Sequence, residues 1–221
     1  MLATTSAFNS LRDISELGEL NFESKAEQLG DVIIKHRLCD IVGVTLLHKH
    51  FNLDEEEQVV QSIRMQEENR QLFIEVKKAH RGRIPYMWCL SAEGSWQPLQ
   101  FMDDEPLIRK RALELFSKLS FLEEFAATLD RLSASEELGL CLKFYDLVGA
   151  NLETDILIES TNRKARWQVF NIRTEVKEEA NTTHWLFSES ENPFTKKCCC
   201  ALRCLKHDDG HETDHYEPAR C

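Results

Sequence analysis

The most regular pattern in the sequence is an apolar repeat within residues 105–132. Its members are separated alternately by four and three residues: Ile108, Ala112, Leu115, Leu119, Leu122, Ala126 and Leu129. This spacing places them all on one face of an α-helix. The preceding Asp-Asp-Glu-Pro run at 103–106 is typical of a helix start. The pattern predicts one amphipathic helix over 105–132, roughly 40 Å long at about 1.5 Å per residue.

Segments with strand-like alternation lie on both sides of this helix. Alternating apolar residues and turn signals predict strands at 41–51, 71–78, 84–91, 96–102, 138–145, 154–160, 166–173 and 183–187. Residues 58–65 fit either a strand or a helix, and residues 24–37 fit a further helix. The short connections predict an antiparallel meander that begins with the 41–51 strand.

The order of these elements predicts an α+β fold: antiparallel sheet or sheets packed against one long amphipathic helix, with a Cys/His-rich C-terminal tail. No βαβ alternation and no glycine-rich phosphate loop is present, which argues against a parallel nucleotide-binding sheet. We expect a loosely docked N-terminal arm at 1–23, an α+β domain at 24–190 and the tail at 191–221.

Charge and composition exclude several classes of partner. The chain has 27 Lys and Arg against 38 Asp and Glu, a formal net charge of −11, which argues against nucleic acid and anionic membranes as partners. The N-terminal segment lacks a signal-peptide pattern, and no stretch approaches the length of a membrane span. We therefore expect a cytoplasmic protein, with a nuclear location as the alternative. In those compartments the eight cysteines are thiols or metal ligands.

Two histidines follow an apolar strand pattern in the stretch Ile41–Leu53, IVGVTLLHKHFNL. If the strand runs unbroken, His48 and His50 continue the face of Val42, Val44 and Leu46. The imidazoles would then lie roughly 7 Å apart. Such a pair can bind a metal, act as acid and base in catalysis, or cap the rim of a core. A functional pair needs a third group, for which the sequence offers His36, His80 and Cys89.

The segment GVTLLHKHFNL resembles a group of uncharacterised hypothetical proteins of filamentous fungi. In that group a similar (L/V)H(R/K)H motif precedes an acidic turn, as the HKH motif precedes Glu55, Glu56 and Glu57 here. The resemblance covers mainly residues 41–53 and implies no established activity, so no catalytic residue is transferred from it. Fungal proteins of this size sometimes accompany natural-product gene sets, which implies an association with secondary metabolism.

A second candidate site lies near the C-terminus. Its residues are spaced by four, three, four and four positions: Cys200, Cys204, His207, His211 and His215. On a helix this spacing brings successive ligands to one side, and thiolate with imidazole is a ligand set that zinc prefers. A flexible tail is the alternative. S-acylation at Cys198, Cys199 and Cys200, which follow two lysines, is a further alternative.

Three functional hypotheses follow from these patterns. The first is a binding or accessory protein, acting on an unknown protein or small molecule through the sheet-and-helix scaffold. The second is a zinc protein that uses the C-terminal cluster, with or without His48 and His50. The third is a small non-metal enzyme in which His48 and His50 are the acid–base groups. The sequence names no substrate and no positioned catalytic triad.

Overall fold

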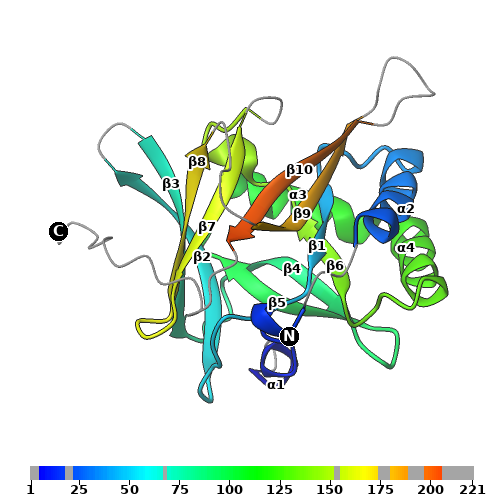
Figure 1. The fold of residues 1–221 in the computed structure, drawn as a ribbon. Helices are drawn as coiled ribbons and strands as arrows, with labels where there is room; N and C mark the ends of the chain where they lie inside the picture. The colour runs from blue at the N-terminus through cyan, green and yellow to red at the C-terminus, as the bar shows by residue number, and fades with distance from the viewer. Residues whose placement is uncertain are drawn as a thin grey trace.

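The computed structural model describes residues 5–17, 22–66, 69–151, 155–173, 180–188 and 197–205. The strands in these ranges form one closed barrel (Figure 1). They are β1 (Val42–Leu46), β2 (Glu57–Gln66), β3 (Asn69–Lys78), β4 (Ile84–Leu90), β5 (Trp96–Met102), β6 (Leu138–Leu142), β7 (Ile156–Asn162), β8 (Trp167–Arg173), β9 (Ala180–Ser188) and β10 (Lys197–Leu205).

The strand order around the barrel is β1-β6-β4-β5-β2-β3-β8-β7-β10-β9, and β9 pairs with β1 to close it. The β2–β5 and β7–β10 contacts are parallel, and the other contacts are antiparallel. Four antiparallel pairs join strands that are consecutive in the chain: β2–β3, β4–β5, β7–β8 and β9–β10. Each described strand has a neighbour on both sides, although β2 pairs with β5, and β10 with β7, over only three residues.

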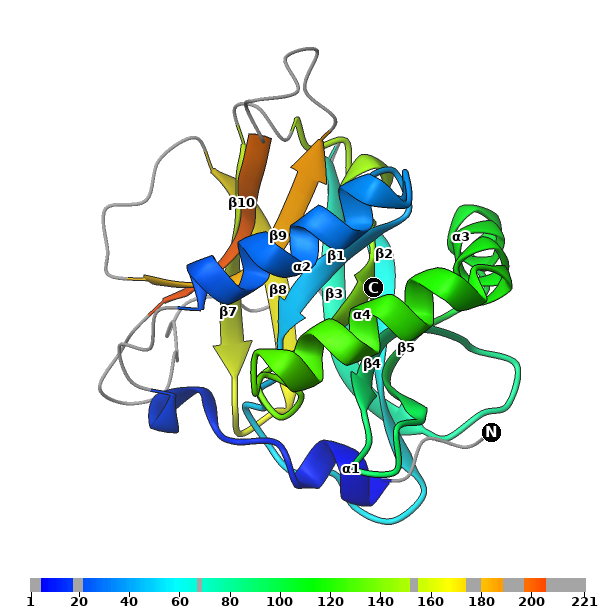
Figure 2. The same ribbon diagram turned by 90° about the vertical axis from the view of Figure 1, so that its right-hand side faces the viewer.

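Three of the described helices pack on the outside of the barrel, and the first lies at its lower end in Figure 2. The described helices are α1 (Thr5–Asn9), α2 (Glu23–Lys35), α3 (Pro106–Ser117) and α4 (Leu119–Arg131), with short 3₁₀ turns η1 (Ile14–Glu16) and η2 (Tyr145–Leu147). Figure 2 shows α2 and α4 side by side in front of β1 and β9, and α2 contacts α4, β1 and β9. Among the described helices, none has the length and apolar composition needed to cross a membrane.

The predicted long helix is wrong. Lys118, with φ −98° and ψ 66°, interrupts it and separates α3 from α4. The predicted apolar stripe breaks there too, because Leu119 is 67% exposed. A straight rod cannot follow the curved outer wall of a barrel. The break lets α3 pack on β4 and β6 while α4 packs on α2. The predicted architecture, sheets on one long helix, is therefore replaced by a strand-rich barrel with short outer helices.

The expected meander is also wrong. β1 does not begin a meander, because its neighbours are β6 and β9 rather than β2. Residues 197–205, expected in a tail after position 190, form β10 between β7 and β9. The N-terminal arm is also firmly packed, since Phe8, Ile14 and Leu17 are 2–3% exposed. These contacts join segments far apart in the sequence, which local patterns do not report.

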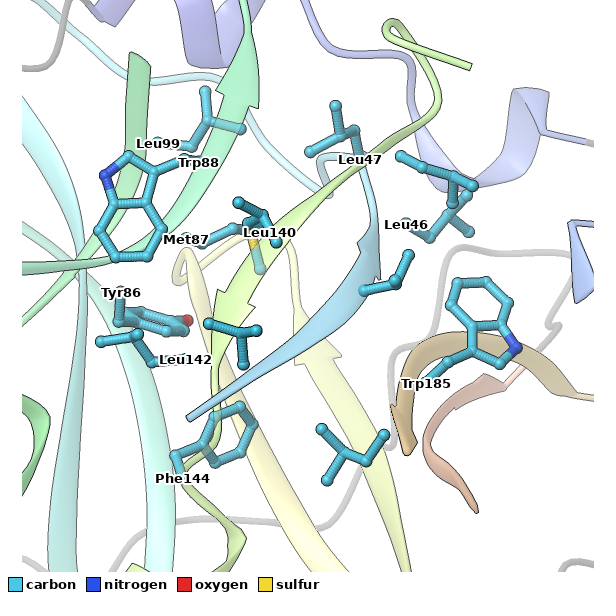
Figure 3. Packing of buried hydrophobic residues seen from close by; sticks show 14 of the residues in the cluster. Leu46, Leu47, Tyr86, Met87, Trp88, Leu99, Leu140, Leu142, Phe144 and Trp185 are labelled. Atoms are coloured by element: carbon cyan, nitrogen blue, oxygen red, sulfur yellow. The ribbon is translucent and has the colours of Figure 1, made fainter. Parts of the chain in front are cut away.

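The barrel has apolar residues on both sides of its β1 wall. On the outer side, Gly30 of α2 lies against the aromatic ring of Phe187 in β9. A Cβ atom added at Gly30 would be only 2.2 Å from that ring. Trp185, two residues before Phe187, therefore faces outward too, and so does its β1 partner Val44. On the inner side, Tyr86 and Phe144 meet edge to face at 6.1 Å between ring centroids (Figure 3).

Replacing Gly139 by alanine is expected to destabilise the barrel by about 3 kcal/mol or more, because overpacking against backbone forces strands apart. An added Cβ at Gly139 would be 2.3 Å from the Trp88 carbonyl oxygen of neighbouring β4. Thermal unfolding should show a melting temperature lower by roughly 6–12 °C. The control is Gly82→Ala in an exposed turn, where the added Cβ meets only the His80 side chain. Equal melting temperatures for both variants would contradict the expectation.

Candidate functional site

The chain turns into the barrel immediately after β1. Thr45 Oγ1 lies 3.3 Å from His184 Nε2, and His184 lines the same cavity as His48 and His50. Thr45 therefore points inward, and Val44, on the other face, points outward. The strand ends at Leu46, so the expectation that His48 and His50 extend the apolar face is wrong. The two rings nevertheless meet, with centroids 4.9 Å apart instead of the expected 7 Å.

Three ligand atoms converge at this point. His48 Nε2 lies 3.1 Å from His50 Nε2, and His50 Nε2 lies 2.6 Å from Glu159 Oε1 of β7. The three atoms all lie within 4.8 Å of one another. Two ligands each about 2.1 Å from a metal, at a right angle, are about 3.0 Å apart. The His48–His50 separation is close to this value, whereas the His50–Glu159 contact has the length of a charge-assisted hydrogen bond and would have to lengthen by a few tenths of an ångström around a shared ion.

Neighbouring groups orient these side chains. His48 Nδ1 lies 2.9 Å from the Leu46 carbonyl oxygen, which can only accept, so Nδ1 carries a proton, and in the neutral imidazole the lone pair is then on Nε2. Glu159 Oε1 accepts hydrogen bonds from Thr161 Oγ1, at 3.1 Å, and from Gln168 Nε2. Supporting bonds of this kind fix ligand orientation in known metal sites.

The electrostatics favour an ionised Glu159 in a buried site. Burial, which leaves Glu159 3% exposed, would by itself raise its pKa. The nearby His50 and His48 imidazoles and the hydrogen bonds outweigh it and lower the pKa to about 2. Burial and the neighbouring His48 lower the pKa of His184 to about 3, so its imidazole is neutral. The site therefore combines a carboxylate with imidazole groups in a region of low solvent access.

A small cavity of about 20 Å³ lies among these residues. Most of its other walls are apolar: Phe8, Phe51, Ile74, Met87, Phe144 and Phe170. Its further polar walls include Gln100, which accepts a hydrogen bond from Tyr86 Oη, and His184. Since one water needs roughly 10–15 Å³ by this measure, the cavity has room for a ligand of only a few atoms.

The N-terminal arm, residues 5–17, lies against this cavity. Phe8 of α1 is one of its walls. Asn9 exchanges two hydrogen bonds with the Leu53 backbone, at 2.9 and 2.8 Å. Asp13 makes a two-pronged ion pair with Arg163, at 2.8 Å for each contact, and this hydrogen bonding holds the pKa of Asp13 well below its usual range. The arm is thereby fixed to the loop that holds His48 and His50 and to the β7–β8 turn.

The structure brings together only part of the predicted site residues. His48 and His50 meet each other and Glu159, a residue outside the predicted site because no local motif marks it. The proposed third groups lie elsewhere: His36 pairs with Glu124 on α4 at 2.8 Å, and His80 accepts from the Gly82 amide. Cys89 of β4 lies 3.8 Å from the Gln97 carbonyl oxygen of β5.

The predicted C-terminal zinc cluster depends on a helix that does not form at Cys200 and Cys204. Both residues lie in β10, where four residues advance the backbone by roughly 13 Å. The helical arrangement expected for this pair is therefore wrong, and metal binding by these cysteines stays a prediction. His207, His211 and His215 lie outside the described residues. Cys198 and Cys199, proposed with Cys200 for S-acylation, lie in β10 too, and that proposal stays a prediction.

The fold and site together define a closed β-barrel with an interior cluster of two histidines and one glutamate. Comparisons of the chain with family models, with curated proteins and with solved structures find no match.

Proposed function

We propose that this protein binds one divalent transition-metal ion inside its barrel, through His48 Nε2, His50 Nε2 and a Glu159 carboxylate oxygen. The observation that supports the proposal most directly is the convergence of these three atoms within 4.8 Å. Two imidazoles and one carboxylate are a ligand set used by zinc enzymes and by non-haem Fe²⁺ enzymes. Three protein ligands leave coordination positions for an outside ligand, which is the arrangement of a catalytic centre rather than a structural one.

The surroundings of the three ligands support this proposal over a chance meeting of polar groups. The Leu46 carbonyl selects the tautomer in which His48 offers its Nε2 lone pair. Thr161 and Gln168 hold the Glu159 oxygen that faces His50. The carboxylate is ionised, as a metal ligand must be. Each ligand side chain thus has an orientation and a charge state suited to metal binding.

Metal analysis of the purified full chain tests the proposal. After loading with Zn²⁺ or Fe²⁺ and removal of excess metal, we expect about one equivalent bound per chain. A variant with His207, His211 and His215 all changed to alanine should retain that equivalent, because the proposal assigns the ion to His48, His50 and Glu159 alone. Binding of less than about a tenth of an equivalent by the parent protein would contradict the proposal. Loss of the metal in the tail variant would instead favour the C-terminal cluster.

A second candidate function is acid–base catalysis without a metal. The observation that favours it is the 2.6 Å contact between His50 Nε2 and the ionised Glu159, a pairing that orients a catalytic imidazole in many enzymes. His48 would then exchange a proton with His50 across 3.1 Å. Activity that persists after a chelator has removed all metal would favour this alternative.

The remaining expectations stay predictions. These are a binding or accessory role in fungal secondary metabolism and a cytoplasmic location. With a metal ion in the barrel, the accessory role would be the binding of a small molecule directly at the metal.

A further inference from the structure

We propose that the open positions of this metal centre accept a ligand of two or three non-hydrogen atoms, of the class of dioxygen, nitric oxide and azide, and that Phe8 excludes larger ligands. This inference rests on the proposed metal site at His48, His50 and Glu159. It adds the size and chemistry of the molecule that binds there.

The size limit follows from the cavity volume. The space beside the three ligand atoms is about 20 Å³. This is enough for one water or a molecule slightly larger, whereas sites for drug-sized molecules enclose roughly 300–1,000 Å³. Ile74, Met87 and Phe144 form part of its walls and are 1–5% exposed. Closely packed walls of this kind do not expand without cost, so the fixed protein admits only a very small ligand.

The wall chemistry favours a small apolar or singly anionic ligand. Two neutral imidazoles and one carboxylate around a divalent ion leave a net charge of about +1 at the centre. The one lysine on the cavity wall, Lys49, donates from Nζ to the Asn9 carbonyl oxygen. Attraction for an anion would therefore come mainly from the metal, and the aromatic walls favour ligands with little polar surface.

Phe8 is the residue best placed to set the size limit. It lies on the cavity wall, is 3% exposed, and packs against Phe51 with ring centroids 6.3 Å apart. The Asp13–Arg163 ion pair and the Asn9–Leu53 hydrogen bonds keep its segment in place. Removing the Phe8 ring would join its volume to the cavity, because the arm around it stays fixed by these contacts.

The test uses the full chain loaded with Co²⁺, whose visible absorption reports changes in its ligands. We expect azide, a linear anion of three nitrogen atoms, to change the spectrum saturably. Acetohydroxamate, a larger anion that also binds metals, should bind roughly tenfold or more weakly. If cobalt binds but azide leaves the spectrum unchanged, the inference is wrong while the metal site stands. If cobalt itself does not bind, the proposed function fails first.

Two variants in the N-terminal arm test whether Phe8 sets the size limit. Phe8→Ala should bind cobalt as the parent does, yet bind acetohydroxamate roughly tenfold or more tightly than the parent. The matched control is Leu17→Ala, in the same arm and equally buried but not on the cavity wall, which should keep the parent's selectivity. Acetohydroxamate binding that is equal in the parent and in Phe8→Ala would overturn the role of Phe8. Both variants are first checked for an unchanged far-ultraviolet circular dichroism spectrum.

Discussion

Replacing Glu159 by glutamine is expected to weaken metal binding by more than the roughly 10–100-fold that loss of a ligand-orienting partner typically causes. The change keeps the size of the side chain but removes the negative charge from a residue that is 3% exposed. A metal ion at the site would then face two imidazoles and a neutral amide, a much poorer set of ligands for a buried divalent cation. Competition with a chromophoric chelator measures the affinity.

The matched control for this prediction is Glu75→Gln. Glu75 lies in β3 of the same barrel, but its side chain is 25% exposed and paired with Arg64 on the outside. Its replacement should leave metal affinity within about twofold of the parent, because exposed charges interact weakly with a buried site. Equal affinity in Glu159→Gln and the parent would show that the carboxylate is not a ligand. The His50–Glu159 contact would then be better explained by the acid–base alternative.

Local patterns predicted most strands of the barrel well. The predicted strands at 84–91 and 96–102 correspond closely to β4 and β5, and the predicted hairpin at 154–173 corresponds to β7 and β8. Alternation of side chains between two faces is a property of each strand alone, so a short window of sequence is enough to detect it. The tight turn at 92–95 then joins β4 and β5 into a hairpin, whereas the turn at 81–83 leads from β3 to β4, which do not pair.

Barrel closure could not be predicted from the same patterns. It depends on pairings such as β1 with β9 and β7 with β10, which join segments far apart in the chain. Nothing in the alternation of Val42 and Val44 specifies which strand will lie beside them. The helix break at Lys118 was equally hidden, because the apolar spacing continues across it and no proline or glycine marks it. Tertiary packing overrode a strong local pattern there.

In the candidate site, too, contacts between residues close in the sequence could be predicted and contacts between distant residues could not. His48 and His50 are separated by one residue, so their closeness was visible in the sequence. The sequence did not show on which side of the barrel wall their side chains lie, because that depends on where β1 ends. Glu159 reaches them only through the position of β7 in the closed barrel. A carboxylate directly after the apolar residues at 156–158 is the one local sign, since a buried charge in a strand needs a partner.

Ending the chain after Ser188 is expected to abolish the single cooperative unfolding transition of the barrel. The truncation removes β10, which pairs along its length with β9 and joins β7 on its other side. The lost backbone hydrogen bonds, each about 0.5–1.5 kcal/mol, sum to several kcal/mol. That loss is comparable with the whole stability of a typical domain, about 5–15 kcal/mol. The control ends after Leu205 and keeps every described strand. If truncation at Ser188 melts like this control, β10 contributes nothing to closure and residues 191–221 are the appendage that the sequence predicted.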